Sequence, residues 1–212
     1  MVELFAEKSK RLQLIITTHS PYFVNWQCIL EGARLIRVFR DESQRSRVCT
    51  LSVESMNSLG SFLNDVNNPH VLGLNASEAV FLNDRVVLVE GQEDVICYQK
   101  AAAQIGENLE ADFFGWGVGG APKMALIARL LQDLGYTRVA GILDGDKEKE
   151  LQELRSQFAS FSFFGISAAN VRDKKKDGKV IRGLCDTACS MHPGSTDEFT
   201  RLFRDIKGAL AR

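Results

Sequence analysis

Acidic side chains follow two apolar segments of this sequence, at the points where each segment ends. Residues 86–89 form a short, mostly β-branched run that leads directly into Glu90, and residues 139–143 lead in the same way into Asp144 and Asp146. Runs of this kind are typical of strands buried on both faces of a parallel sheet. Ligands of open α/β sheets collect beyond the carboxyl ends of such strands. Carboxylate oxygens gathered there suit a hard divalent cation such as Mg²⁺ or Mn²⁺.

Helix capping is the simpler interpretation of these acids, with Asp146 capping the helix that follows it. Capping explains one carboxylate and leaves the others unexplained. Gly91 and Gly145, each next to an acidic strand end, allow a ligand to approach the backbone, so we favour metal binding. Asp94, four residues after Glu90, is expected on the same side and is a further candidate ligand. An exposed first-turn acid that complements the helix dipole explains Asp94 nearly as well.

Phosphodiester cleavage is the reaction that these residues predict. Two divalent ions about 4 Å apart can stabilise charge on the attacking and leaving oxygens and generate the hydroxide. Glu90 would bind one ion or accept a proton from the attacking water. Asp144 would hold the first ion or bridge both, and Asp146 would hold the second. The predicted cofactor is therefore Mg²⁺ or Mn²⁺, with two ions bound.

A glycine-rich turn and a basic segment are candidates for contacts with DNA phosphates. The turn, residues 115–120, leads into a predicted helix N-terminus, which is a ready anion site. Residues 172–182 hold six cations and two acids and are expected to be a loop beside the acidic site. For the glycine-rich segment the competing interpretation is a tight structural turn, and for the basic segment it is a solvated charged loop. Dinucleotide binding by the glycine-rich segment is a weaker interpretation, because no acidic residue follows at the end of the next strand as in a Rossmann fold. The expected phosphate contacts are Gly119, Gly120, Lys123, Lys174, Lys175, Lys176 and Lys179.

The two acidic motifs together resemble a Toprim domain, the metal-dependent fold of topoisomerases, bacterial primases and certain nucleases. A Toprim strand ending in Glu and a later Asp-x-Asp match Glu90 within LVEG and the pair Asp144 and Asp146 within LDGD. More closely, nearly the whole chain, including FLNDRVVLVEGQED, resembles the overcoming-lysogenization-defect (OLD) nucleases, in which an ABC-type ATPase precedes the Toprim domain. The resemblance implies DNA cleavage and a role in phage defence or DNA repair. It also implies a catalytic lysine near the metal ions, for which Lys174 is the candidate, with Lys179 behind it.

The first part of the chain is predicted to be a remnant of the ATPase plus a linker, residues 1–83, followed by the Toprim domain, residues 84–212. Residues 12–18 are expected to form a buried strand that ends at His19. The His-Ser-Pro that follows resembles the switch loop of ABC-type ATPases, whose histidine contacts the γ-phosphate of ATP. A capped turn with His19 on the surface is almost equally compatible. Two strands within residues 34–53, joined by a polar turn, are predicted to form a hairpin.

From residue 84 onward strands and helices are predicted to alternate, which gives an α/β fold with a mainly parallel sheet flanked by helices. The expected strands are 84–89, 111–117, 137–143 and 160–165, and the expected helices are 92–106, 121–134, 147–158 and 196–210. Cys185, Cys189 and His192 have spacings that could bind zinc, but only three ligands are local. The two cysteines are more simply small apolar residues one helical turn apart.

Composition limits the classes of function. The chain has 212 residues, 45% hydrophobic and 25% charged, as in ordinary soluble proteins, and its net charge of −1 requires local patches for DNA binding. Its odd count of five cysteines favours a reducing, cytoplasmic setting, and no apolar run is long enough to span a membrane. No phosphate-loop motif occurs, so ATP hydrolysis is not expected from this chain alone.

The expected partners are DNA and an ATPase domain, in the same chain or a separate one, with possible homo-oligomers formed through the ATPase. Another Toprim enzyme, of topoisomerase or primase type, is the first alternative function. A topoisomerase would need a catalytic tyrosine in a companion domain, and the three tyrosines are Tyr22, Tyr98 and Tyr136. The second alternative is a non-catalytic module that binds DNA or dimerises.

Overall fold

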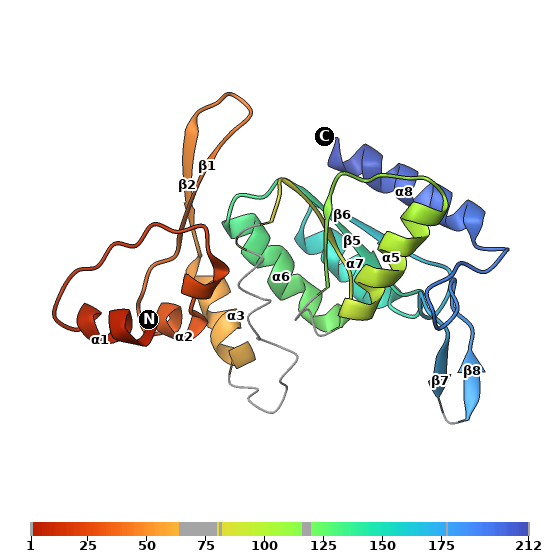
Figure 1. Ribbon diagram of the computed structural model, residues 1–212, viewed down its shortest axis with the longest axis horizontal. Coiled ribbons are helices and arrows are strands. Elements are labelled where there is room, and N and C mark those ends of the chain that lie inside the picture. Colours follow the sequence, from red (N-terminus) through yellow and green to blue (C-terminus); the bar gives the residue numbers. More distant parts are fainter. Residues whose placement is uncertain (1, 64–79, 81, 116–119, 177, 212) are drawn as a thin grey trace.

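A computed structural model describes residues 2–63, 80, 82–115, 120–176 and 178–211 (Figure 1). Its C-terminal part is built on a four-stranded parallel sheet with the order β4-β3-β5-β6. The strands are β3 (Arg85–Leu88), β4 (Asp112–Phe114), β5 (Arg138–Leu143) and β6 (Ser162–Gly165). The predicted α/β fold with a parallel sheet is confirmed.

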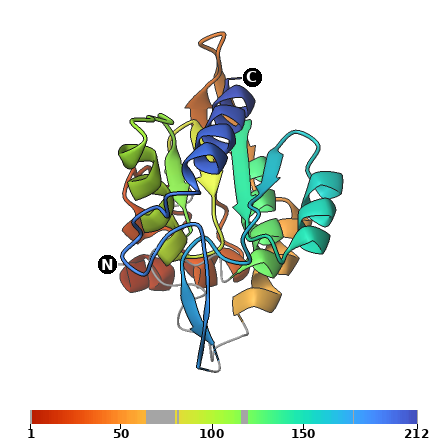
Figure 2. The same ribbon diagram turned by 90° about the vertical axis from the view of Figure 1, so that its right-hand side faces the viewer.

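Helices cover both faces of this sheet (Figures 1 and 2). Val86 and Leu88 of β3 belong to one core cluster with residues of α6 (Ala121–Asp133) and α7 (Glu148–Gln157). Val87 and Val89 point to the opposite face, in a second cluster with residues of α5 (Gln92–Gln104) and α8 (Thr196–Leu210). Successive residues of a strand face opposite sides, so a strand between two helical layers must be apolar throughout. This two-sided burial explains the continuous apolar runs before Glu90 and Asp144.

The N-terminal part consists of short elements around a separate two-stranded sheet. Its elements are α1 (Val2–Ser9), the 3₁₀ helix η1 (Pro21–Phe23), α2 (Trp26–Leu30), β1 (Ile36–Arg40), β2 (Ser46–Thr50) and α3 (Val53–Leu63). Strands β1 and β2 pair antiparallel, so the predicted hairpin is confirmed.

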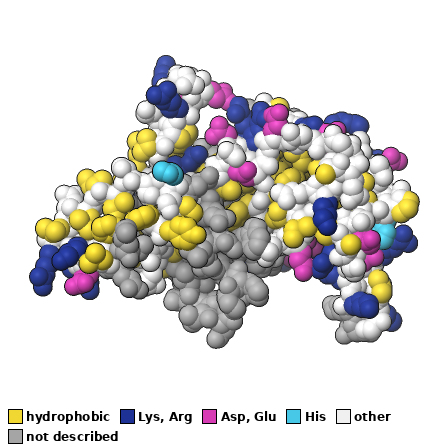
Figure 3. Space-filling view, viewed as in Figure 1, with side chains coloured by type: hydrophobic (Ala, Val, Ile, Leu, Met, Phe, Trp, Pro, Cys, Tyr) yellow, Lys and Arg dark blue, Asp and Glu magenta, His cyan; other side chains and the backbone are white. Residues whose placement is uncertain are grey.

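The predicted buried strand at residues 12–18 is wrong. These residues form no strand and are all exposed, with Ile15 86% accessible. A strand needs a partner for its backbone N–H and C=O groups, and within the described ranges no neighbouring strand lies alongside this segment. Figure 3 shows hydrophobic side chains gathered on the surface of this N-terminal part, at the left of the view.

The base of the β1–β2 hairpin rests on the C-terminal end of α6. Arg37 donates a hydrogen bond to the carbonyl oxygen of Leu134 at 2.8 Å, and its guanidinium lies 4.0 Å from the centre of the Tyr136 ring. The backbone N–H of Ser52 donates to the Asp133 carboxylate at 2.7 Å. These polar and cation–π contacts add to an apolar interface, because Trp26 and Ile29 of α2 belong to the same buried core cluster as residues of α6.

The basic segment 172–182 is a second hairpin, where a loop was expected. Strands β7 (Lys174–Lys176) and β8 (Lys179–Ile181) pair antiparallel, with Lys175 opposite Val180, and the hairpin projects from the body of the molecule (Figures 1 and 2). Gly178 in the turn has φ of 75°, a conformation that glycine adopts without strain. The expected loop is therefore wrong, because the Asp-Gly dipeptide at 177–178 favours a two-residue hairpin turn that lets the flanking residues pair.

The segment after β8 is also different from the expectation. Cys185 and Cys189 lie in an irregular loop and are not one helical turn apart. Cys189 forms a disulfide with Cys97 of α5, with the two Cα atoms 4.8 Å apart, and Cys185 is a buried free thiol. Within the described residues no helix is long and apolar enough to cross a membrane.

Candidate functional site

Glu90 and Asp144 meet at the carboxyl ends of two neighbouring strands. Leu88 of β3 is in register with Gly141 of β5, so both strands end at the same edge of the sheet. The backbone N–H of Asp144 donates a hydrogen bond of 2.8 Å to Oε1 of Glu90. The Asp144 carboxylate is buried and accepts a bond of 3.1 Å from the backbone N–H of Val171. The two carboxylates are thus held at adjacent strand ends by backbone groups.

Asp94 lies in the first turn of α5 and is the third carboxylate of this acidic group. Its Oδ2 accepts a bond of 2.9 Å from the backbone N–H of Gly91, so Asp94 stabilises the helix start, but it is half-buried and is not the exposed acid of the dipole interpretation. Asp94 also contributes to the electrostatics of Asp144, whose pKa its negative charge raises. A capping role and a place in the acidic group are therefore compatible.

Burial and mutual repulsion disfavour the charged forms of these acids. Burial, followed by repulsion from Glu90 and Asp94, raises the pKa of Asp144 to about 7. Burial raises the pKa of Asp94 to about 6, with Lys174 opposing this shift. Burial also raises the pKa of Glu90, although the backbone N–H groups of Asp144 and Ala121 act in the opposite direction. Buried carboxylates that repel one another take up either protons or a cation at neutral pH.

Asp146 is more exposed than the other acids and does not cap the next helix. Its carboxylate lies 3.1 Å from the ammonium of Lys147, and Lys147 occupies the N-cap position of α7. The backbone between the two aspartates is tightly packed, because a Cβ on Gly145 would lie 2.5 Å from the carbonyl oxygen of Ile166. Only glycine fits there, which keeps Asp144 and Asp146 on one short turn.

In the described part of the chain, no three Asp, Glu, His or Cys side chains already form a cation cage. The reason is visible in the hydrogen bonds, since Glu90, Asp94 and Asp144 each direct one oxygen to a backbone N–H and Asp146 faces Lys147. The donor set nevertheless fits Mg²⁺ or Mn²⁺, because it consists of hard carboxylate oxygens whose shared negative charge is uncompensated except by nearby lysines.

Lys174 brings a positive charge to the acidic group from the first residue of β7. Its charge lowers the pKa of both Asp94 and Asp144, opposing the effect of burial on each. Lys175 and Lys179 lie exposed on the same hairpin. Lys176 belongs to β7, and its side chain lies outside what the structure describes.

The glycine-rich turn is described only at its ends. Gly120 is the N-cap of α6 with φ of 89°, and Lys123 lies in the first turn of that helix. The backbone N–H of Gly120 donates to the carbonyl oxygen of Glu90 at 3.1 Å, so this helix start lies beside the acidic group. Gly119 lies outside the described residues.

His19 lies in the N-terminal part, where its side chain is exposed. Ser20 and Pro21 form the N-cap and first residue of the short η1 helix, and the Ser20 N–H donates to the Thr18 hydroxyl at 3.0 Å. Ser20 holds the N-cap position without a side-chain hydrogen bond to the helix, so only the surface position of His19 and the place of Pro21 agree with the simpler interpretation. A contact of His19 with nucleotide stays a prediction.

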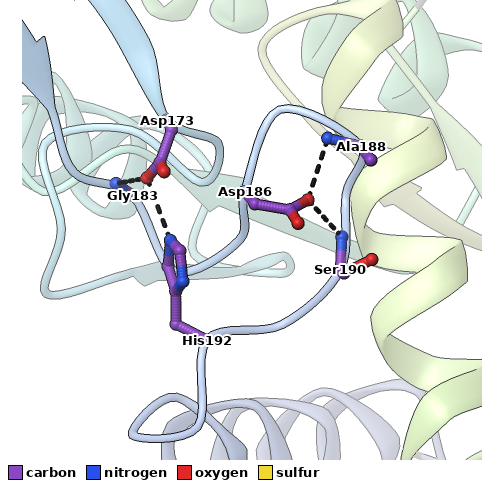
Figure 4. Close-up of polar contacts among 6 residues, drawn as sticks. All are labelled: Asp173, Gly183, Asp186, Ala188, Ser190 and His192. Atoms are coloured by element: carbon purple, nitrogen blue, oxygen red, sulfur yellow. Dashed lines mark hydrogen bonds and ion pairs between the residues drawn. The ribbon is translucent and has the colours of Figure 1, made fainter.

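Sequence reasoning missed two interactions that surround the site. Arg172 forms an ion pair with Glu93, and Asp173 pairs with His192 (Figure 4). Each pair joins residues far apart in the sequence, so local spacing carries no signal for either. The basic segment was noted for its lysines, whereas its Arg172 and Asp173 make the contacts that fix its position.

The fold and the site define a mixed α/β protein whose four-stranded parallel sheet, flanked by helices, is consistent with a Toprim domain. Residues 81–146 match the family model described as "Overcoming lysogenization defect protein-like, TOPRIM domain". The matched segment contains Glu90, Asp94, Asp144 and Asp146, and it ends before Lys174. A search of curated proteins gave no match.

Proposed function

We propose that this chain is the nuclease part of an OLD-type ATPase–nuclease and that it cleaves DNA phosphodiester bonds with Mg²⁺ or Mn²⁺, as an endonuclease or nickase. One observation supports the proposal most strongly. Glu90 and Asp144 lie at adjacent strand ends, 2.8 Å apart between Oε1 and the backbone nitrogen, and burial raises the pKa of both. Such a pair is electrostatically unfavourable without protons or a bound cation.

Glu90, Asp94, Asp144 and Asp146 would hold two divalent ions. Bound ions of this kind stabilise negative charge on the attacking and leaving oxygens of a phosphodiester and acidify a bound water. With a pKa of about 7, Asp144 is partly protonated at neutral pH in the absence of metal. Metal binding would therefore release protons, and affinity for the ion would rise with pH.

The chain's other side chains have separate roles in this proposal. Glu90 would bind one of the ions or accept a proton from the attacking water. Lys174 would stabilise negative charge that develops at the phosphate. Lys175 and Lys179 on the hairpin, with Lys176, would bind neighbouring phosphates without sequence preference. The start of α6, with Gly119, Gly120 and Lys123, would bind a further phosphate.

The first 83 residues would connect this nuclease to its ATPase, supplied in the same chain or by a partner, with oligomers formed through the ATPase. In that assembly His19 would contact bound ATP. Defence against phage or DNA repair is the setting that the OLD resemblance implies.

Nicking of supercoiled plasmid tests the proposal. Wild type should convert plasmid to open circles with Mg²⁺ or Mn²⁺ and not with chelator, and Glu90→Ala and Asp144→Ala should lose this activity. Asp197→Asn removes an exposed carboxylate in the first turn of α8 and is the matched control, which should cut like wild type. Cutting that persists in chelator or in both alanine variants would contradict the proposal.

A DNA-binding module without catalysis is the second candidate, and the exposed lysines of the projecting β7–β8 hairpin favour it. Such a module would shift DNA in a gel without cutting it under any metal condition. Asp144→Ala would leave that shift unchanged, and Lys175→Ala with Lys179→Ala would weaken it. These outcomes separate binding from hydrolysis.

A further inference from the structure

The Asp173–His192 pair lies at the base of the β7–β8 hairpin (Figure 4). Asp173 Oδ1 is 3.1 Å from Nε2 of His192 and also accepts a bond of 2.7 Å from the backbone N–H of Gly183. Both side chains are largely buried, with 17% of Asp173 and 20% of His192 exposed. The Gly183 N–H and His192 both lower the pKa of Asp173, so the carboxylate is held in its charged form.

The Asp173 carboxylate links the residue before β7 to Gly183, which follows β8. Asp173 immediately precedes β7, and its backbone N–H donates to the carbonyl oxygen of Cys185 at 2.8 Å. Gly183 follows β8 and packs so closely that a Cβ would lie 2.5 Å from the carbonyl carbon of Arg172. Lys174 directly follows Asp173 in the chain, so its position depends on where Asp173 is held.

The loop that carries His192 is ordered by its own hydrogen bonds. Asp186 Oδ1 accepts from the backbone N–H groups of Ala188 at 2.8 Å and Ser190 at 2.9 Å (Figure 4). The backbone N–H of His192 then donates to the carbonyl oxygen of Leu184 at 2.9 Å. These hydrogen bonds fix the backbone of the loop on which His192 lies.

The same loop is fixed to α5, the helix that begins with Asp94. Cys189 is joined to Cys97 by the disulfide, and Gln104 accepts a bond of 3.1 Å from the backbone N–H of Met191. A continuous set of contacts thus runs from α5 through the loop to His192 and on to Asp173, the residue directly before Lys174.

We propose that His192 is a positioning residue, which through Asp173 holds the hairpin base so that Lys174 stays opposite Asp94 and Asp144. The inference rests on the proposed function, because it assigns a partner to the proposed catalytic lysine. In this role His192 contacts neither the proposed metal ligands, Glu90, Asp94, Asp144 and Asp146, nor the substrate. Its removal would leave the lysine on the protein but free the hairpin to move away from the reacting phosphate.

Kinetics of plasmid nicking test this role. His192→Ala should lower kcat about tenfold, the effect of losing a hydrogen bond to a charged group, with KM for plasmid unchanged. His192→Gln offers an amide donor in place of the imidazole nitrogen and should restore most of the loss. Thr187→Ala changes an exposed residue of the same loop and is the control expected to match wild type.

A double mutant identifies the route of the effect. If His192 acts through Lys174, adding His192→Ala to Lys174→Ala should slow nicking no further. Additive losses, or a change in KM alone, would overturn the positioning role.

Amide hydrogen exchange in metal-free protein provides a second measurement that does not depend on catalysis. His192→Ala should speed exchange in residues 174–183 about tenfold, and Thr187→Ala should not. If wild type fails to cut plasmid, the proposed function fails; if exchange in the hairpin is unchanged in His192→Ala, the anchoring by His192 fails separately.

Discussion

The two parts of the chain treat their apolar residues very differently. Residues 86–89 at β3 are 0% exposed, with helices on both sides of the sheet. On the β1–β2 hairpin, Val38 and Val48 pair with one another and are 66% and 68% exposed. The apolar segment 12–18 is exposed as well. Similar residue types are therefore fully buried in the sheet and largely exposed on the hairpin and in segment 12–18, although Trp26 and Ile29 of α2 are buried in the core that they share with α6.

This difference determines where chemistry can take place. The acids at the ends of β3 and β5 lie against a closed core, so burial changes their pKa. The N-terminal part has no comparable low-dielectric pocket among its described residues, and Asp41, its one acid with a shifted pKa, is stabilised in the charged form. A surface that remains apolar in the N-terminal part is what the predicted ATPase neighbour would cover.

The largest expected effect is on the rate of DNA cleavage, which should depend on the C-terminal part and not on the N-terminal part. In single-turnover cleavage of a labelled duplex with Mn²⁺, Asp144→Ala should slow the reaction by about 10²–10³-fold, because a group that stabilises developing charge is lost. His19→Ala, which removes an exposed side chain of the N-terminal part, should have no effect on this chain alone. Equal losses in the two variants would place the site outside the C-terminal sheet.

Stability should show the same division at a smaller scale. Phe203→Ala removes a fully buried ring that stacks on Phe199 at 5.8 Å and should lower the free energy of unfolding by about 3–5 kcal/mol. Val38→Ala on the exposed hairpin face should change it by less than about 0.5 kcal/mol. Urea denaturation followed by circular dichroism measures both, and a large loss in Val38→Ala would show that this face is covered in solution.

Much of the C-terminal fold could be predicted because two-sided burial leaves a direct trace in the sequence. The runs before Glu90 and Asp144 are continuous and apolar, and glycines follow them, so strand ends and candidate ligands could be located without coordinates. The match of residues 81–146 to the OLD-like TOPRIM model agrees with that prediction. The assignment of these acids to metal stays a prediction.

The rest could not be predicted because it depends on distant partners. Residues 12–18 have the composition of a strand, and only the lack of a neighbour among the described residues decides otherwise. Cys97 and Cys189 are 92 residues apart, and the Asp173–His192 contact brings together two separate loops. Spacing along the chain contains no information on such pairs, whereas the β7–β8 hairpin has a local signal in the Asp-Gly dipeptide at 177–178.

The pH dependence of stability should have opposite signs in the two parts. Asp144 has its pKa raised from 3.8 to about 7, so the folded state binds more protons than the unfolded state across that range. Metal-free protein should therefore lose stability as pH rises from about 4 to about 7, by on the order of 2 kcal/mol. Asp144→Asn should reduce this slope and leave the part due to Asp94 and Glu90, whose pKa values are also raised, whereas added Mg²⁺ should remove it. Asp41 has its pKa lowered, first by the Arg45 N–H and then by Arg47, so its contribution is present above its unfolded pKa and is lost as pH falls through its folded value. Thermal denaturation of wild type, Asp144→Asn and Asp41→Asn from pH 4 to 8 measures these slopes, and a slope that Asp144→Asn leaves unchanged would rule out this carboxylate as a source.

The smallest effect concerns one polar contact between the two parts, which also share the buried core cluster of Trp26 and Ile29 with α6. Arg37→Ala removes the bond to the Leu134 carbonyl and the contact with the Tyr136 ring, and should lower the free energy of unfolding by about 1–2 kcal/mol. Arg40→Ala on the same strand removes an exposed cation and should cost less than about 0.5 kcal/mol. Neither variant should change the cleavage rate, because the contact lies at the C-terminal end of α6 and the acids lie beside the start of that helix. If Arg37→Ala slowed cleavage without unfolding the protein, the N-terminal part would have to act on the site through α6, and the independence of the two parts would be disproved.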